Sequence, residues 1–296
     1  MSLPAKIVIG AIALLAIATV YLRPLTVYSA LREVYLLAIG VRGHHVQVGR
    51  HRIHYLVAGE GPPLVLVHGV AMRAADLAPL FRALSRQHRV YAPDLLGYGG
   101  SDKPRGADYS ITMQTDIVRG FLDAVRLEQP DVMGVSMGGW IAMKLAAEHP
   151  QRVRRLVLVS SAGFTFKTSL NELSFSARTI PELRASLSLQ TDRADMIPPF
   201  ILRDILRESK KKSWITRASM RSMLTRGEVL DGKLQRVRMP VLLVWGTADR
   251  IVPFAVAARM QRELPQARMV SLQGCGHLAI IECRSDALPP IVQFLR

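Results

Sequence analysis

The sequence predicts an α/β fold with a mostly parallel, doubly wound sheet, a helical lid inserted into it and a transmembrane helix before it. Apolar runs of strand length alternate with segments of helical periodicity from residue 46 onward. Several runs are continuous Val and Leu stretches, as expected of strands covered on both faces. At 296 residues, 49% of them hydrophobic, the chain is large enough for one sizeable α/β domain and too apolar to be disordered.

Residues 1–45 form the predicted anchor region. Residues 7–22 contain no charged side chain, and Lys6 and Arg23 flank them. A spanning helix needs about 20 apolar residues, which residues 3–22 supply if the Lys6 amine reaches the headgroups. We therefore expect a retained single-pass anchor and a membrane location, with a cleaved signal peptide or a buried core helix as alternatives.

The anchor is expected to continue into an amphipathic helix. Val27, Leu31, Val34 and Ala38 recur at helical spacing, and such a helix could lie along a membrane. Basic residues stand on both sides of the apolar segment. Their count leans weakly towards a cytoplasmic domain and leaves the orientation open.

Residues 46–163 form the first part of the predicted core. Residues 46–59 alternate as two strands around a turn at Gly49-Arg50. Further strands are expected over residues 63–67, 89–92, 132–135 and 156–161, and helices over 77–87, 111–125 and 138–147.

Residues 164–236 break this alternation and are predicted to form a helical lid. Such an insertion would lie over the ends of the strands, where open α/β sheets bind ligands. Its large apolar residues fit equally well an acyl-binding roof or the lid's own core: Phe164, Phe166, Leu170, Phe175, Ile197, Phe200, Ile201 and Trp214. The core resumes over residues 237–296, with strands over 241–246 and 268–272 and a helical segment over 260–264.

Ser136 is the predicted nucleophile. It lies in Gly134-Val135-Ser136-Met137-Gly138, directly between an apolar strand and an apolar helix, which is the context of a nucleophile elbow. Glycines on either side allow the sharp turn and let the backbone approach a substrate closely.

A serine nucleophile needs a histidine base that is itself oriented by a carboxylate. Asp249 follows the strand over 241–246, and His277 follows the strand over 268–272 in a loop with two glycines. Both therefore fall at strand ends, after Ser136, in the order that this type of sheet requires. The backbone N–H groups of Val70, just after His68-Gly69, and of Met137 are the predicted oxyanion-hole donors.

His68 is more easily explained as structural than as catalytic. The cluster from Asp94 to Asp102 is expected to shape the loop around the oxyanion hole.

The chain has a basic excess, 39 Lys and Arg against 23 Asp and Glu, which suggests anionic partners. A nucleic acid is not expected, because only 6% of the residues are aromatic and no nucleic-acid-binding motif is present. Cys275 and Cys283 have no metal-ligand spacing, and we expect two buried, unreactive thiols rather than a disulfide framework. No metal or cofactor is expected, since the triad supplies both nucleophile and base.

Together these motifs resemble the α/β-hydrolase superfamily over residues 46–296. They are HGV from residue 68, DLLGYGGSDKP from 94, GVSMGGWIAMKLAAEHPQRV from 134, LLVWGTADRIVP from 242 and GCGH from 274. With the N-terminal apolar segment, YSITMQTDIVRGFLDAVRLE and LVSSAGF, the chain is similar to the membrane-anchored, monoacylglycerol lipase-like serine hydrolases.

The resemblance implies hydrolysis of a carboxylic ester through an acyl-enzyme, on a small-molecule or lipid ester. Ser136 stands where dehalogenases and epoxide hydrolases carry an Asp, which argues against both activities. A C–C bond hydrolase, a haloperoxidase-like enzyme on the same triad, and a non-catalytic ligand-binding protein remain as alternatives. The oligomeric state is left open.

Overall fold

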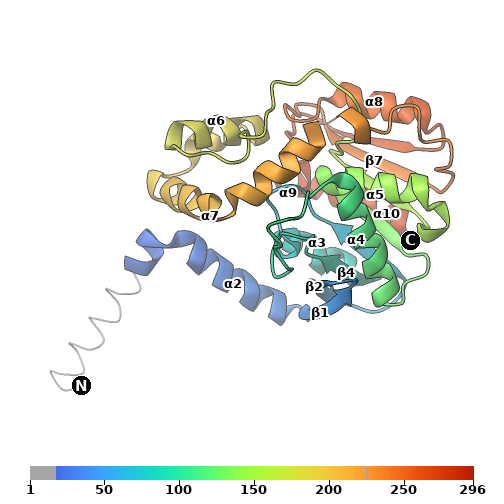
Figure 1. The fold of residues 1–296 in the computed structure, drawn as a ribbon, viewed down its shortest axis with the longest axis horizontal. Coiled ribbons are helices and arrows are strands. Elements are labelled where there is room, and N and C mark those ends of the chain that lie inside the picture. Colours follow the sequence, from blue (N-terminus) through green and yellow to red (C-terminus); the bar gives the residue numbers. More distant parts are fainter. Residues whose placement is uncertain (1–17, 225) are drawn as a thin grey trace.

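The structure is a computed structural model that describes residues 18–224 and 226–296. One eight-stranded sheet lies at its centre (Figure 1). Its strand order is β1-β2-β4-β3-β5-β6-β7-β8. β1 and β2 form an antiparallel hairpin, β2 also pairs antiparallel with β4, and every later pair is parallel. The prediction of a mostly parallel α/β sheet is confirmed.

The strands are β1 Arg42–Val48, β2 His51–Ala58, β3 Pro63–Val67, β4 Arg89–Pro93, β5 Asp131–Val135, β6 Leu156–Val159, β7 Val241–Gly246 and β8 Arg268–Leu272. The α-helices of the described residues include α2 Pro24–Ala38, α3 Ala78–Leu84, α4 Ile111–Ala124, α5 Met137–Glu148, α6 Ile180–Gln190, α7 Pro199–Leu224, α8 Phe254–Glu263, α9 Ala279–Glu282 and α10 Arg284–Leu295. Short 3-10 turns lie at Ala74–Leu77, Pro150–Arg152, Ala194–Met196 and Arg226–Glu228.

The sheet is buried on both faces, and alternate residues of a strand serve opposite faces. In β3, Val65 and Val67 pack with α4 and α5, while Leu64 and Leu66 pack with α3 and α10. This is the side-chain alternation of any strand, here apolar on both sides. The continuous Val and Leu runs that predicted these strands therefore have their physical reason in the two helical layers.

A helical insertion joins β6 to β7 and contains α6 and α7 (Figure 1). Its residues pack a small apolar cluster of their own around Leu183 and Leu202. α7 is 26 residues long, with Leu202, Ile215 and Met220 buried along it. The insertion thus combines its own small core with contacts to the sheet domain.

Two boundaries differ from the sequence-based expectation, and one helix, α10, was not predicted. β1 begins at Arg42, so the sheet starts before residue 46. The helix expected over 260–264 is α8, which begins at Phe254, directly after Pro253. α10 forms although Pro289 and Pro290 lie inside it, because Ala287, Ile291 and Leu295 bury one face against the sheet.

The N-terminal helix α2 lies against both the insertion and the sheet domain (Figure 1). Its buried residues are Arg32 and Leu36, whereas Leu31 is 64% exposed and Val34 63% exposed. The amphipathic stripe expected from the sequence therefore faces outward. Within the described part of the chain, no helix has both the length and the apolarity needed to cross a membrane. The predicted anchor over residues 7–22 lies mostly outside the described residues.

Candidate active site

Ser136 occupies a sharp turn between β5 and α5. Its backbone has φ +54° and ψ −116°, a conformation that residues other than glycine rarely adopt. The turn depends on close backbone approach: a Cβ at Gly134 would lie 2.2 Å from the Gly138 carbonyl oxygen, and one at Gly138 would lie 2.2 Å from that of Val67. The glycines of the motif are therefore a steric requirement of this elbow.

Two further strand ends bring His277 and Asp249 to Ser136. His277 Nε2 lies 2.9 Å from Ser136 Oγ, and His277 Nδ1 lies 2.8 Å from Asp249 Oδ2. The backbone N–H groups of Ile251 and Val252 both donate to Asp249 Oδ1 over 2.9 Å. The carboxylate is thus held at one oxygen and orients the imidazole with the other, while Asp249 and His277 are both buried.

The predicted oxyanion donors lie on either side of Ser136. Met137 is the first residue of α5, so its N–H has no partner within the helix. Val70 follows β3 and lines the same cavity as Ser136, and among the described residues its N–H donates no hydrogen bond. A Cβ at Gly69 would lie 3.4 Å from Ser136 Cβ, which shows how closely this loop passes the serine.

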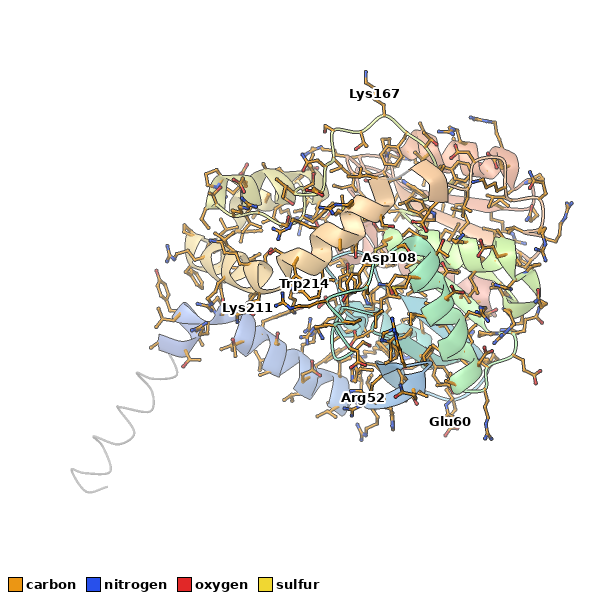
Figure 2. All side chains as sticks on the ribbon, in the orientation of Figure 1. Arg52, Glu60, Asp108, Lys167, Lys211 and Trp214 are labelled. Carbon is orange, nitrogen blue, oxygen red and sulfur yellow. A yellow bond between two sulfur atoms is a disulfide. The ribbon has the colours of Figure 1, made fainter. Side chains whose placement is uncertain are left out.

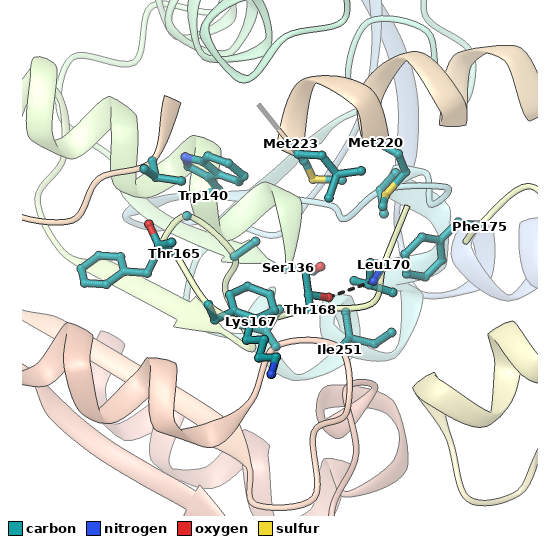
Figure 3. A pocket seen from close by; sticks show the side chains of 18 residues that line it. Ser136, Trp140, Thr165, Lys167, Thr168, Leu170, Phe175, Met220, Met223 and Ile251 are labelled. Carbon is teal, nitrogen blue, oxygen red and sulfur yellow. Dashed lines mark hydrogen bonds between the residues drawn. The ribbon is translucent and has the colours of Figure 1, made fainter. Parts of the chain in front are cut away.

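Ser136 opens into a cavity of about 330 Å³ between the sheet and the insertion (Figure 3). Trp140 of α5, Phe166 and Leu170 of the segment after β6, and Met220 and Met223 of α7 all face it. Of the described residues that line it, Lys167 alone is charged, and its side chain points away from the body of the molecule (Figure 2). The space beside Ser136 is therefore apolar.

A model of the alpha/beta hydrolase family matches residues 64–288. The chain belongs to this family.

Its relatives within the alpha/beta hydrolases include enzymes for different bonds. The chain is 30% identical to a 2-hydroxymuconate semialdehyde hydrolase of Pseudomonas sp. (strain CF600), over 76% of this chain and 83% of that protein. It is 29% identical to Lipase 1 of Psychrobacter immobilis, over 78% of this chain and 75% of that protein. The crystal structure of a membrane phospholipase A superposes with a TM-score of 0.84 at 27% identity, covering 98% of both chains.

Asp94 organises the loops behind the predicted oxyanion hole, in keeping with the expected loop-shaping role of its cluster. One carboxylate oxygen accepts the N–H of Ala74 over 2.7 Å, and the other accepts the N–H of Gly100 over 2.8 Å and lies 2.7 Å from His54 Nδ1. Burial by itself would raise the pKa of Asp94, but the hydrogen bonds from His54, Gly100 and Ala74 hold it below its ordinary value.

Sequence reasoning missed the role of His54. It lies on β2, whose pairing with β4 sets it beside Asp94, and that pairing is not encoded locally. His68 is structural, as expected: its Nε2 accepts the N–H of Leu95 over 3.0 Å, so Nδ1 carries the proton and donates to the Gly69 carbonyl. Burial lowers the pKa of His68, which keeps the ring neutral.

The expectation of two free thiols is wrong, because Cys275 and Cys283 form a disulfide. Their Cα atoms are 6.3 Å apart, since the short helix α9 folds the chain back on itself. A separation of eight residues does not by itself indicate a disulfide or a metal site. In the fold, one helical turn between two loops brings the two sulfur atoms together. The bond closes the loop that carries His277.

Glu228 attaches the end of the insertion to the sheet domain. Its carboxylate accepts the N–H of Thr112 over 2.7 Å and that of Ile111 over 3.2 Å at the start of α4, and the hydroxyl of Ser222 over 2.7 Å. Its carbonyl accepts Trp140 Nε1–H over 3.1 Å. Tyr98 adds a second tie, donating to Ser219 of α7, and burial raises the pKa of Tyr98 to about 12.

The described residues contain no cluster of three or more His, Cys, Asp or Glu that could hold a metal ion. The side chains and backbone amides brought together here provide a hydroxyl, a base that can activate it and two candidate N–H donors for an oxyanion.

Proposed function

We propose that this alpha/beta hydrolase cleaves carboxylic esters with apolar acyl chains through a Ser136, His277 and Asp249 triad. The observation that carries the proposal is the opening of Ser136 directly into an apolar cavity. Its volume, about 330 Å³, is in the usual range for small-molecule sites. Acyl-glycerols and similar lipid esters are the substrate class that fits best.

The first half of the reaction acylates the serine. His277 Nε2 takes the Ser136 proton as Oγ attacks the ester carbonyl, and the N–H groups of Val70 and Met137 stabilise the negative oxygen that develops. His277 then gives that proton to the leaving alcohol. Asp249 stays ionised and stabilises the imidazolium.

The second half releases the acid. Water loses a proton to His277 Nε2 and attacks the acyl carbonyl, again with the oxyanion at Val70 and Met137. The tetrahedral intermediate collapses, and His277 returns the proton to Ser136 Oγ. The enzyme is restored, and one water molecule has been consumed for each ester cleaved.

The insertion supports the proposal of a lid, because part of it roofs the serine. Of its large apolar residues, Phe164, Phe166, Leu170 and Phe175 line the cavity. Ile197 packs inside the insertion, and Phe200 stacks on Tyr21 with ring centroids 4.8 Å apart. The acyl-roof and lid-core interpretations thus each hold for part of the set.

A C–C bond hydrolase is the second candidate, favoured by the likeness to the 2-hydroxymuconate semialdehyde hydrolase. The substrate named there is a carboxylate, which needs a cationic or strongly polar partner when it is buried. Among the described residues that line this cavity, the outward-pointing Lys167 is the one cation. This difference supports the ester over the C–C bond.

We further propose that the chain is anchored in a membrane through its N-terminal segment, with the hydrolase domain outside the cytosol, the opposite of the side that the basic-residue count weakly favours. The exposed apolar face of α2, including Tyr28, Leu31 and Val34, supports a location at the membrane surface. The Cys275–Cys283 disulfide supports an oxidising compartment. Protease accessibility of the domain in sealed membrane vesicles of known orientation tests this: digestion from the non-cytosolic side supports the proposal, and protection on that side contradicts it.

The experiment that tests the function is hydrolysis of p-nitrophenyl esters from acetyl to palmitoyl by the full chain in detergent, beside Ser136→Ala. Turnover by the wild type that the variant lacks supports the proposal. If the wild type cleaves none of these esters but cleaves a meta-cleavage dienoate, the C–C bond candidate replaces it. A protein that binds acyl ligands without turning over either class would be the non-catalytic alternative.

A further inference from the structure

α2 carries a buried charge on its inner face. Arg32 is only 8% exposed, although most of the helix around it is exposed. Its guanidinium forms an ion pair with Asp76 of the sheet domain. Burying an unpaired guanidinium costs a large desolvation free energy, so a buried arginine needs a charged partner. The role of Arg32 therefore depends on Asp76.

Asp76 closes the loop that follows β3 and carries Val70. One of its carboxylate oxygens accepts the N–H of Arg73 over 3.0 Å, while the other meets Arg32. Next to it, Asp94 accepts the N–H of Ala74 over 2.7 Å. The C-terminal end of the loop is therefore held by the carboxylates of Asp76 and Asp94, and Arg32 of α2 neutralises the charge of Asp76.

The loop before these two contacts is strained, because Ala71 has φ +61°, in the left-handed region that residues with a Cβ rarely adopt. Such a conformation persists only where its surroundings fix it. On the near side the loop is fixed by His68 and passes close to Ser136. On the far side it is fixed by Asp76.

α2 is also fixed at its other end. The N–H of Leu25 donates to Asp204 Oδ2 on α7 over 3.0 Å, and Asp204 is fully buried and paired with Arg207. α2 therefore has a defined position relative to both the insertion and the loop. It lies before residue 64, where the family match begins.

We propose that Arg32 is a positioning residue for the oxyanion hole: through Asp76 it holds the loop that presents the Val70 N–H to Ser136. The inference rests on the proposed ester hydrolysis. Without the guanidinium, a partly buried carboxylate faces Asp94 with no cation opposite it. Asp76 then turns to solvent or takes up a proton, the Arg73 turn loosens, and the strained loop relaxes away from Ser136.

The groups around Asp76 make the direction of this effect clear. Burial raises the pKa of Asp76, and Asp94 acts in the same direction, whereas Arg32 lowers it. Arg73 and Glu33 face each other at 3.8 Å beside the same turn. Arg32 contributes the ion pair within this group, so its removal favours the protonated carboxyl.

The test compares Arg32→Met, Arg32→Lys and a surface control, Arg82→Met on α3, in the full chain with p-nitrophenyl butyrate. We expect Arg32→Met to lower kcat roughly 10-fold to 100-fold with KM changed less than about threefold, because only the transition state uses the oxyanion donors. Arg32→Lys keeps the charge and should recover to within about fivefold of the wild type. Arg82→Met should match the wild type.

A second readout separates positioning from general stability. A trifluoromethyl ketone adds Ser136 Oγ to its carbonyl carbon, leaving a negative oxygen where the oxyanion forms while the serine proton passes to His277. Its inhibition constant should rise in Arg32→Met by the same factor as kcat/KM falls. Thermal unfolding of each variant shows whether it is folded. If Arg32→Met does not fold, Arg32→Gln replaces it, and the same changes in kcat, KM and inhibition constant are expected.

Three results would overturn the inference: a folded Arg32→Met with unchanged kcat, a loss confined to KM, or an Arg32→Lys as impaired as Arg32→Met. Wild type that hydrolyses no ester contradicts the proposed function instead. Active wild type with an indifferent Arg32→Met contradicts only the role of Arg32.

Discussion

His277 Nε2 lies 2.9 Å from Ser136 Oγ, although 141 positions separate the two residues in the sequence. Parallel strands explain this proximity. β5 ends directly before Ser136, β7 ends before Asp249 and β8 ends before His277, and the carboxyl ends of parallel strands lie along one edge of the sheet. Three loops far apart in the chain thus converge on one point.

Asp249→Asn should reduce kcat about 10⁴-fold with little change in KM, as the corresponding change does in a Ser-His-Asp triad. The asparagine fits the same space, but it removes the negative charge and favours the wrong imidazole tautomer. The measurement is kcat and KM on p-nitrophenyl butyrate.

Asp123→Asn is the matched control, because Asp123 is an exposed carboxylate of α4 that pairs only with Arg152 at 2.6 Å among the described residues. It should behave as the wild type. An Asp249→Asn enzyme within tenfold of wild-type kcat would remove Asp249 from the mechanism.

Gly138→Ala should destabilise the protein and inactivate it. The new Cβ would lie 2.2 Å from the Val67 carbonyl and 2.5 Å from that of His68, both of them backbone atoms that cannot turn aside. Overpacking of this kind typically costs about 1–3 kcal/mol. The start of α5, and with it the Met137 N–H, must move, so we expect kcat to fall more than about 100-fold.

Gly106→Ala provides the comparison, since nothing lies within 4 Å of a Cβ there. Circular-dichroism melting and ester turnover of both variants check the prediction. Equal melting temperatures for Gly138→Ala and the wild type would show that the elbow tolerates a side chain.

Much of this arrangement was predictable because it depends on local patterns. Continuous Val and Leu runs mark buried strands, and the glycines around Ser136 mark a turn that only they permit. Residues at strand ends, such as Asp249 and His277, follow from those two patterns. Because the strands are parallel, residues that follow the carboxyl ends of different strands lie close together at one edge of the sheet.

The features that escaped prediction depend on pairings between distant segments. His54 reaches Asp94 only because β2 pairs with β4, and Arg32 reaches Asp76 only because α2 packs on the sheet domain. Neither side chain stands in a recognisable motif. The cysteine pair was missed for a different reason: the helical turn at α9 is only four residues long and has no periodicity to detect.

Met223→Trp should shorten the acyl chains that the enzyme prefers. Met223 lines the cavity from α7, opposite Ser136 (Figure 3), and an indole there fills space that an acyl chain would occupy. Each buried methylene is worth about 0.8 kcal/mol, or roughly fourfold in kcat/KM. Excluding three or four methylenes should therefore reduce decanoyl turnover at least 30-fold and leave acetyl turnover nearly unchanged.

The control is Met196→Trp in the same insertion, where the methionine is 78% exposed. The readout is the profile of kcat/KM against chain length. Parallel profiles for Met223→Trp and the wild type would mean that acyl chains bind elsewhere.

Glu228→Gln should weaken the attachment of the insertion in a pH-dependent way. Burial alone would raise the pKa of Glu228, but the hydrogen bonds from Thr112, Ser222 and Ile111 more than offset it and hold the pKa below its ordinary value of 4.5. A depressed carboxyl pKa stabilises the folded state above the unfolded value, and this contribution is lost as the pH falls through the folded value. We expect a lower melting temperature at pH 7, by about 2–4 °C.

The difference between Glu228→Gln and the wild type should shrink as the pH falls below 4.5 towards the folded pKa. Glu60→Gln, at an exposed position between β2 and β3, serves as the control and should show no such trend. A difference that is constant from pH 7 to pH 3.5 would assign the effect to packing rather than to charge.

Removing the Cys275–Cys283 bond should destabilise the protein and disturb the loop of His277. The bond closes a short loop, so chain entropy predicts a loss of about 2–3 kcal/mol in the double variant Cys275→Ser/Cys283→Ser. Cys275 is buried two positions before His277, and the Ala248 N–H donates to its carbonyl over 3.0 Å, next to Asp249. A loosened loop therefore acts on both residues that activate Ser136, and we expect a fall in kcat as well as in melting temperature.

Treatment of the wild type with dithiothreitol should reproduce both effects, while the double variant should not respond to it. If the reductant changes neither, the two thiols are not joined in the active protein, and the argument for an oxidising compartment falls with the bond.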